Sequence, residues 1–262
     1  MITYVTVRGT GEHRWAPGNM LNRVARLTTG PIEQVDLDYA ASIAVFNPRG
    51  DLTGVSEAES RRQGVRNLAA AIRATPHLVV LSGYSLGALV VSDFLEAQAR
   101  GEYQDCEIRA VVNIANPARA AGQSYGLPSF GYGLDGQHGA WPDGLPVYEI
   151  ANNVDAITSA PAGSPWRFFA DKIRTFSITQ HGADEWFQTM IAQLQRRERT
   201  QAADNWTDPA FWQSYAEAPA WLRGYLFDGQ HGAAYGQPRW IDPQGRRVTG
   251  QELAAQIVSS YA

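Results

Sequence analysis

Apolar residues fall into two patterns that alternate along the first part of the chain. Short β-branched or continuous apolar runs predict buried strands, whereas apolar residues three or four positions apart predict helices. The first pattern predicts strands at 2–8, 32–39, 77–82, 107–115 and 146–152. The second predicts helices at 19–27, from Ser56 to about Thr75, and from Leu86 onward. This alternation predicts an α/β fold with a central, mostly parallel sheet flanked by helices.

Three stretches lie outside this simple alternation. The helix predicted from Ser56 has an acidic first turn, whose charges we expect on a solvated face, and it ends at Pro76. Residues 118–146 are rich in Gly, Pro, Tyr and Ser, which predicts a long functional loop. Largely helical patterns loaded with aromatic residues follow at 166–169, 183–197 and 208–227, before a turn at 242–245 and a short helix at 250–261. We therefore predict one domain, 1–262, with a helical cap or linker insertion at 160–227 that covers the sheet.

The stretch 77–90 changes from a strand pattern to a helix pattern across Gly83-Tyr84-Ser85-Leu86-Gly87. At such a turn the serine takes a strained backbone conformation that lifts its hydroxyl above the end of the sheet. Glycines flank it because a Cβ there would collide with the neighbouring strand or helix. G-x-S-x-G also arises by chance in a glycine-rich chain, but few chance copies stand between a strand and a helix. Ser85 is therefore the predicted nucleophile.

A serine hydroxyl is almost wholly protonated at neutral pH and needs a general base, usually a histidine held by a carboxylate. The order serine, acid, histidine along the chain leaves His181 and His231 among the five histidines. His231 is favoured because flanking glycines let a loop carry the imidazole over the sheet, with His181 as the alternative. Asp155 is the favoured acid because it follows a predicted strand. Three other aspartates lie in loops that no strand leads into: Asp135, Asp143 and Asp171.

A second glycine-rich strand end, Arg8-Gly9-Thr10-Gly11-Glu12, follows the first predicted strand. Such a turn can direct a backbone N–H and the Thr10 hydroxyl toward an oxyanion, although an ordinary tight turn before a helix is an equal alternative. In the predicted mechanism Ser85 attacks an ester carbonyl, His231 takes and returns the proton, and Asp155 stabilises the imidazolium. The oxyanion receives N–H groups from Leu86 and the Thr10 turn, and water then releases the acyl group.

Composition narrows the function classes further. The net charge of −4 gives no electrostatic reason to expect nucleic-acid binding. The single cysteine, Cys106, excludes an intrachain disulfide and is expected to be a small buried residue. No histidine or aspartate spacing resembles a metal site, and the mechanism requires no cofactor. The first residues lack the pattern of a signal peptide, and no apolar run approaches a membrane span, so we expect neither export nor membrane insertion.

The Gly83–Gly87 motif, the Val7–Glu12 strand end and the Ser, Asp, His order resemble those of the cutinase-like α/β hydrolases. Within that group the chain is most similar to the lysin B esterases of actinobacterial phages. The absence of disulfide cysteines, the absence of a signal peptide and the long aromatic segment between Asp155 and His231 favour lysin B over secreted cutinases. Residues 146–155 and 231–235 also resemble that family's acid and histidine motifs. One departure is Leu86, where many relatives carry glutamine, so that only a backbone oxyanion donor is expected there.

This resemblance implies an enzyme that hydrolyses the ester joining mycolic acids to arabinogalactan. It also implies that the chain stays in the host cytoplasm until lysis and then acts at the cell envelope. The aromatic residues of the insertion would either line a groove for acyl chains or simply pack the insertion onto the domain. Two other functions stay open: a general carboxylesterase or lipase with no cell-wall role, and a non-catalytic binding or virion protein on the same fold.

Overall fold

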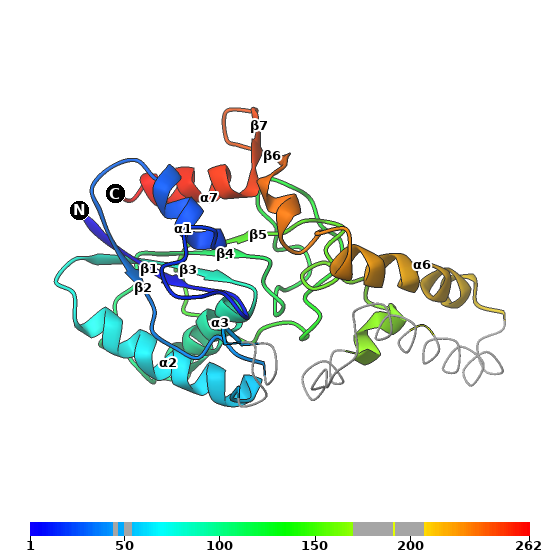
Figure 1. Ribbon diagram of the computed structural model, residues 1–262, viewed down its shortest axis with the longest axis horizontal. Coiled ribbons are helices and arrows are strands. Elements are labelled where there is room, and N and C mark those ends of the chain that lie inside the picture. The colour runs from blue at the N-terminus through cyan, green and yellow to red at the C-terminus, as the bar shows by residue number, and fades with distance from the viewer. Residues whose placement is uncertain (44–46, 50–53, 170–190, 192–206) are drawn as a thin grey trace.

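A computed structural model describes residues 1–43, 47–49, 54–169, 191 and 207–262 of the chain. Its central sheet, built from described residues, contains five strands that are all parallel, in the order β2-β1-β3-β4-β5 (Figure 1). The predicted strands are confirmed, although four are shorter than their apolar runs and β3 extends two residues past its run. They are β1 (Ile2–Val7), β2 (Ile32–Asp36), β3 (Leu78–Tyr84), β4 (Ala110–Ile114) and β5 (Val147–Ile150).

Each face of the sheet is covered by a pair of helices (Figure 1). On one face α1 (Met20–Leu27) and α7 (Gly250–Ser259) pack on side chains such as Tyr4 and Val80. On the other, α2 (Glu57–Arg73) and α3 (Leu86–Ala99) pack on side chains such as Val5 and Leu81. Successive strand residues point to opposite faces, so strands buried on both sides are apolar throughout. This is why these strands appear in the sequence as continuous apolar runs.

The sheet has a topological switch point between β1 and β3. These strands pair in parallel with Val7 opposite Gly83, so both end at the same edge. From β1 the chain turns to α1 on one face, and from β3 it turns to α3 on the other. Two loops that diverge in this way leave a crevice at the carboxyl ends of the strands, which is where open α/β sheets bind ligands.

The region after β5 packs beyond this carboxyl edge rather than on a sheet face. A short 3-10 helix (Pro165–Phe169) and α6 (Pro209–Leu226) form a third apolar cluster with loop residues. The buried members of the cluster are Leu134, Ala156, Ile157, Ala160, Trp166, Ala218 and Leu222. Because other helices cover both faces, α6 packs at the edge of the sheet, and the extent of the predicted insertion stays a prediction. The remainder of the predicted insertion, 170–190 and 192–206, lies outside the described residues.

A hairpin that the apolar pattern did not predict precedes the last helix. Strands β6 (Pro238–Ile241) and β7 (Arg247–Thr249) pair antiparallel on either side of the predicted turn at 242–245. They are too short to produce a recognisable alternation. The following helix, α7, begins at a capping box in which Thr249 and Glu252 satisfy each other's backbone N–H groups.

The acidic start of α2 corrects one expectation about charge. Ser56 caps the helix as predicted, and its side chain accepts the Glu59 N–H. Glu57, however, is buried rather than solvated. The reason is Arg61, whose guanidinium lies against Glu57, Asp93 from α3 and Asp135 from the long loop. The first turn of α2 is thus part of a charged contact between three segments.

Cys106 is buried, as predicted for a small apolar residue. Among the helices in the described ranges, none combines the length and apolar character needed to cross a lipid bilayer.

Candidate active site

Ser85 stands at a strained turn between β3 and α3. Its φ of +53° lies in the left-handed region, which is uncommon for a residue other than glycine and marks a constrained site. The flanking glycines are required by space. A Cβ on Gly83 would come within 2.5 Å of Ala88 Cα, and one on Gly87 would lie 1.9 Å from the Val7 carbonyl oxygen. The structure therefore shows the strand–turn–helix that the G-x-S-x-G pattern predicts.

The three predicted catalytic side chains lie side by side, and His231 is within hydrogen-bonding distance of both Ser85 and Asp155. His231 Nε2 is 2.8 Å from Ser85 Oγ. The other ring nitrogen, Nδ1, is 2.9 Å from Asp155 Oδ2 and 3.1 Å from Oδ1. This is the geometry that a serine nucleophile, a general base and an orienting carboxylate require. The imidazole is partly buried and the Asp155 carboxylate is completely buried, so the pair interacts largely out of contact with solvent.

The turn after β5 fixes the carboxylate. Asp155 Oδ1 accepts the Ile157 N–H at 2.9 Å, and Oδ2 accepts the Tyr235 hydroxyl at 3.0 Å. Asn152 anchors the base on the same side, because its side-chain amide donates to the Gln230 carbonyl oxygen at 2.9 Å. Tyr235 and Asn152 therefore contact the candidate triad, although the sequence assigned neither to the site. Only their positions in the sequence could have indicated them: Asn152 ends the predicted strand, and Tyr235 follows the histidine by four residues.

Tyr84 supports the imidazole from the opposite side. Its hydroxyl donates to the His231 carbonyl oxygen at 2.9 Å, and its ring stacks against the imidazole with centroids 5.7 Å apart. Burial raises the pKa of Tyr84 well above its usual value, so the phenol stays a neutral donor. The residue that precedes the nucleophile thus also positions the base.

The other candidate side chains that the structure describes lie away from Ser85. Of the alternative acids, Asp135 pairs with Arg61, and Asp143 precedes the amino end of β5, at the edge away from Ser85. The imidazole of His138 stacks on Trp141 with centroids 3.4 Å apart and contacts Gln123 at 2.8 Å. His181 and Asp171 fall outside the described residues. Within the described ranges no cluster of three His, Cys, Asp or Glu side chains could hold a metal ion.

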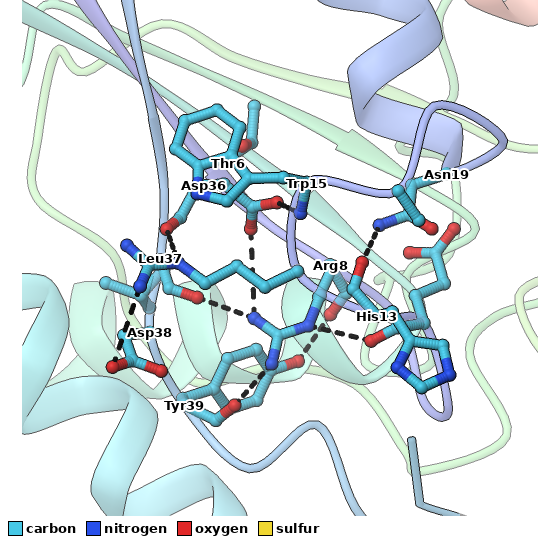
Figure 2. A network of polar contacts seen from close by, with 12 residues as sticks. Thr6, Arg8, His13, Trp15, Asn19, Asp36, Leu37, Asp38 and Tyr39 are labelled. Carbon is cyan, nitrogen blue, oxygen red and sulfur yellow. Dashed lines mark hydrogen bonds and ion pairs between the residues drawn. The ribbon is translucent and has the colours of Figure 1, made fainter. Parts of the chain in front are cut away.

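The loop that follows β1 is held beside the nucleophile by a buried arginine. The Arg8 guanidinium donates to the carbonyl oxygens of Glu12, Leu37 and Tyr39, and it lies 3.7 Å from Asp36 (Figure 2). The same loop closes on itself, because the Glu12 carboxylate accepts the Gly9 N–H at 2.8 Å. Burial raises the pKa of both Glu12 and Asp36, and hydrogen bonds from backbone N–H groups oppose that rise.

This loop contacts the nucleophile turn directly. A Cβ on Gly9 would approach the Tyr84 ring to 2.7 Å, so only glycine fits here without displacing that ring. Thr10 follows immediately and is partly exposed at the crevice between β1 and β3. Leu86, the second predicted oxyanion residue, is the first residue of α3, and its side chain is buried in the apolar core between α3 and the sheet. It can contribute only its backbone N–H, at the first turn of the helix. The oxyanion roles of Thr10 and Leu86 remain predictions.

Two solved structures align with this chain and show which fold it has. The catalytic core domain of acetyl xylan esterase from Trichoderma reesei aligns with a TM-score of 0.50 at 18% identity, over 65% of this chain and 92% of its own. Lysin B from mycobacteriophage D29 aligns with a TM-score of 0.52 at 15% identity, over 98% of both chains. The chain has the cutinase-like α/β-hydrolase fold. No protein-family model and no curated protein sequence matches this chain.

The predicted resemblance to cutinase-like esterases, with similarity to lysin B, is therefore confirmed at the level of structure. The fold class is confirmed by the same comparison. Identities of 15–18% establish a shared architecture and carry no substrate with them. The activity of this protein has to be argued from its own site.

A second buried carboxyl group lies under the site, on β5. Glu149 accepts the side-chain amides of Asn113 and Asn116, each at 2.9 Å. Its other carboxylate oxygen has no hydrogen-bond partner among the described residues. Burial raises the pKa of Glu149 to about 7, against the opposing effects of the two amides and Arg119.

This gives a testable dependence of stability on pH. Between about pH 4.5 and 7 the folded protein keeps a proton on Glu149 that the unfolded chain releases, so the free energy of unfolding falls as pH rises through this window. Glu149→Gln removes the titration. We expect the variant to gain about 3 kcal/mol relative to the wild type between pH 4.5 and 8, measured by urea unfolding. A constant difference between the two proteins would show that Glu149 does not titrate there.

Proposed function

We propose that this protein is a serine esterase that hydrolyses lipid esters through an acyl-enzyme. The observation that carries the proposal is the continuous hydrogen-bonded path from Ser85 through His231 to Asp155, at the switch point of an α/β sheet. Each structural neighbour reported above is itself named as an esterase or a lysin. A triad of this geometry is maintained at a cost, because it requires a strained serine and a buried carboxylate.

The mechanism follows from the atoms that face one another. In the resting state the Ser85 hydroxyl donates to His231 Nε2, while Nδ1–H donates to Asp155. Attack of Oγ on the ester carbonyl moves the hydroxyl proton to Nε2, and the buried carboxylate stabilises the imidazolium that results. Nε2 then gives this proton to the departing alkoxide as the tetrahedral intermediate collapses. A water molecule, deprotonated by the same nitrogen, releases the acid and restores Ser85.

The oxyanion formed in both steps needs donors at the same edge of the sheet. The first N–H groups of a helix have no partner within the helix and carry partial positive charge. The N–H of Leu86 at the start of α3 is in this position. The Thr10 turn, held next to Tyr84 by the Arg8 network, would supply the second donor.

We further propose that the substrate is the mycolate ester of arabinogalactan and that the protein acts at the cell envelope during phage lysis. The extent of structural similarity favours this over a general carboxylesterase. Lysin B aligns over nearly the whole chain, whereas the acetyl xylan esterase core leaves about a third of it without a counterpart. In this chain α6 packs at the carboxyl edge near the triad, where it would meet a large lipid substrate.

One pair of assays separates the possibilities. Purified protein is incubated with isolated mycobacterial cell wall and, separately, with tributyrin emulsion. Release of free mycolic acids from the wall, lost in Ser85→Ala, is expected. Hydrolysis of tributyrin without mycolate release would indicate a general carboxylesterase. If neither ester is cleaved and a fluorophosphonate probe does not label Ser85, the protein is a non-catalytic member of the fold.

A further inference from the structure

The mechanism above leaves one buried hydroxyl group unused. The Tyr235 hydroxyl lies 3.0 Å from Asp155 Oδ2, the oxygen that also accepts the His231 Nδ1–H. It lies equally close to the Asn152 N–H, which donates to it. We propose that Tyr235 is a positioning residue that sets the basicity of His231 through Asp155. The inference rests on the proposed function, since it assigns a role within the same triad.

The direction of these hydrogen bonds is fixed by the surroundings. A backbone N–H can only donate, so Asn152 occupies a lone pair of the phenol oxygen and leaves its proton for the carboxylate. Burial also raises the pKa of Tyr235 well above its usual value, which keeps that proton in place over the working pH range. Asp155 Oδ2 therefore shares its negative charge between a phenol and an imidazole.

The hydroxyl can be separated from the ring. The Tyr235 ring stacks on Trp240, with centroids 5.3 Å apart, inside the apolar cluster beneath α7. A phenylalanine would keep that packing. The two contacts of the hydroxyl are with the acid and with the backbone turn that carries it, so its removal changes the hydrogen bonding of Asp155 and leaves the core filled.

The expected effect of Tyr235→Phe has a definite sign. With one donor fewer, the carboxylate stabilises the imidazolium form of His231 more strongly, so the acid limb of the kcat/KM profile moves to higher pH. We expect kcat to fall about tenfold, because a hydrogen bond to a charged group has been lost from the unit that orients the base. KM should be unchanged, since a completely buried side chain cannot touch the substrate.

Other ionisable groups face this pair and are unchanged by the substitution. Tyr84 and Tyr225 flank the imidazole, and burial raises the pKa of both phenols. Glu12 lies on the Tyr84 side, and Arg119 lies within electrostatic reach of Asp155. Arg239 contacts the Asn152 side chain at 3.2 Å. Their contributions cancel when variant and wild type are compared at each pH.

The experiment measures pH profiles for p-nitrophenyl butyrate hydrolysis and for the rate at which a fluorophosphonate probe labels Ser85. Tyr148→Phe is the matched control, because that hydroxyl contacts the Tyr261 hydroxyl at 3.1 Å, away from the triad. An acid limb displaced upward and a lower kcat in Tyr235→Phe, with neither change in the control, support the role. Profiles identical to those of the wild type or the control overturn it.

A second variant keeps the test valid if Tyr235→Phe does not fold. Site-specific 3-fluorotyrosine at position 235 retains the hydroxyl but makes it a stronger donor, so the acid limb should move to lower pH, opposite to the phenylalanine variant. An unmoved limb in this variant overturns the role. If wild-type Ser85 reacts with neither ester nor probe, the proposed function fails and this inference with it. A reactive wild type with unresponsive variants overturns the positioning role alone.

Discussion

Replacement of Ser85 by alanine is expected to reduce ester hydrolysis by at least about 10⁴-fold while leaving the fold intact. The Ser85 hydroxyl lies 2.8 Å from the imidazole, and among the described residues no other nucleophilic side chain is recorded in contact with that nitrogen. Alanine fits the same turn without adding atoms, and the Ser85 N–H keeps its bond to the Ile114 carbonyl oxygen. Hydrolysis of p-nitrophenyl butyrate and the thermal unfolding midpoint are the two measurements required.

Ser260→Ala is the matched control for this result. Ser260 is an exposed serine at the end of α7, and its hydroxyl donates to a backbone carbonyl oxygen of the same helix. Its removal should leave both activity and labelling by a fluorophosphonate unchanged. Turnover retained in the Ser85→Ala protein at more than a trace would mean that the nucleophile lies elsewhere.

The second large effect is expected in stability, from Arg119→Met. Arg119 is completely buried, and its five hydrogen bonds are to neutral oxygens rather than to a carboxylate. The acceptors include the Thr158 carbonyl oxygen in the segment after Asp155, at 2.9 Å, and the Gly131 carbonyl oxygen in the long loop, at 2.6 Å. Methionine would fill much of the space but leave buried acceptors without donors, each costing about 1–3 kcal/mol.

We therefore expect Arg119→Met to lose about 4 kcal/mol of unfolding free energy in guanidinium titrations. Arg100→Met removes an arginine of similar size from an exposed position beside Glu102 and should change stability by less than about 0.5 kcal/mol. Equal effects of the two substitutions would show that the buried network does not hold the loop. The comparison isolates the hydrogen bonds because both variants lose the same charge.

The parts of this protein that the sequence predicts are those governed by local rules. The largely apolar runs identify β1, β3 and β4 because both sides of the sheet are covered there, whereas the edge strands β2 and β5 are only partly buried. Gly83 and Gly87 identify the nucleophile turn because neighbouring backbone leaves no room for a Cβ. Asp155 could be chosen from its place after a strand, since parallel strands end at one edge. In each case the signal is carried by a few consecutive residues.

The histidine could not be fixed in this way, and a repeat in the chain shows why. The hexapeptide Asp-Gly-Gln-His-Gly-Ala occurs at 135–140 and again at 228–233. In the first copy the imidazole stacks on Trp141, and in the second it faces Ser85. Identical local sequence thus gives two environments, which are decided by contacts with distant segments. Space also does not require a glycine beside His231, since a Cβ on Gly232 would meet only the Tyr84 hydroxyl, at 3.7 Å.

The tight approach of α3 to β1 has a consequence for how this protein could be altered. Where Gly87 meets the Val7 carbonyl oxygen, helix and strand are in backbone contact, and the reactive serine is locked to the loop that begins at Arg8. A library aimed at new acyl specificities should therefore keep these positions constant and diversify α6 and the long loop instead. Variation concentrated at the nucleophile turn would yield mostly insoluble protein.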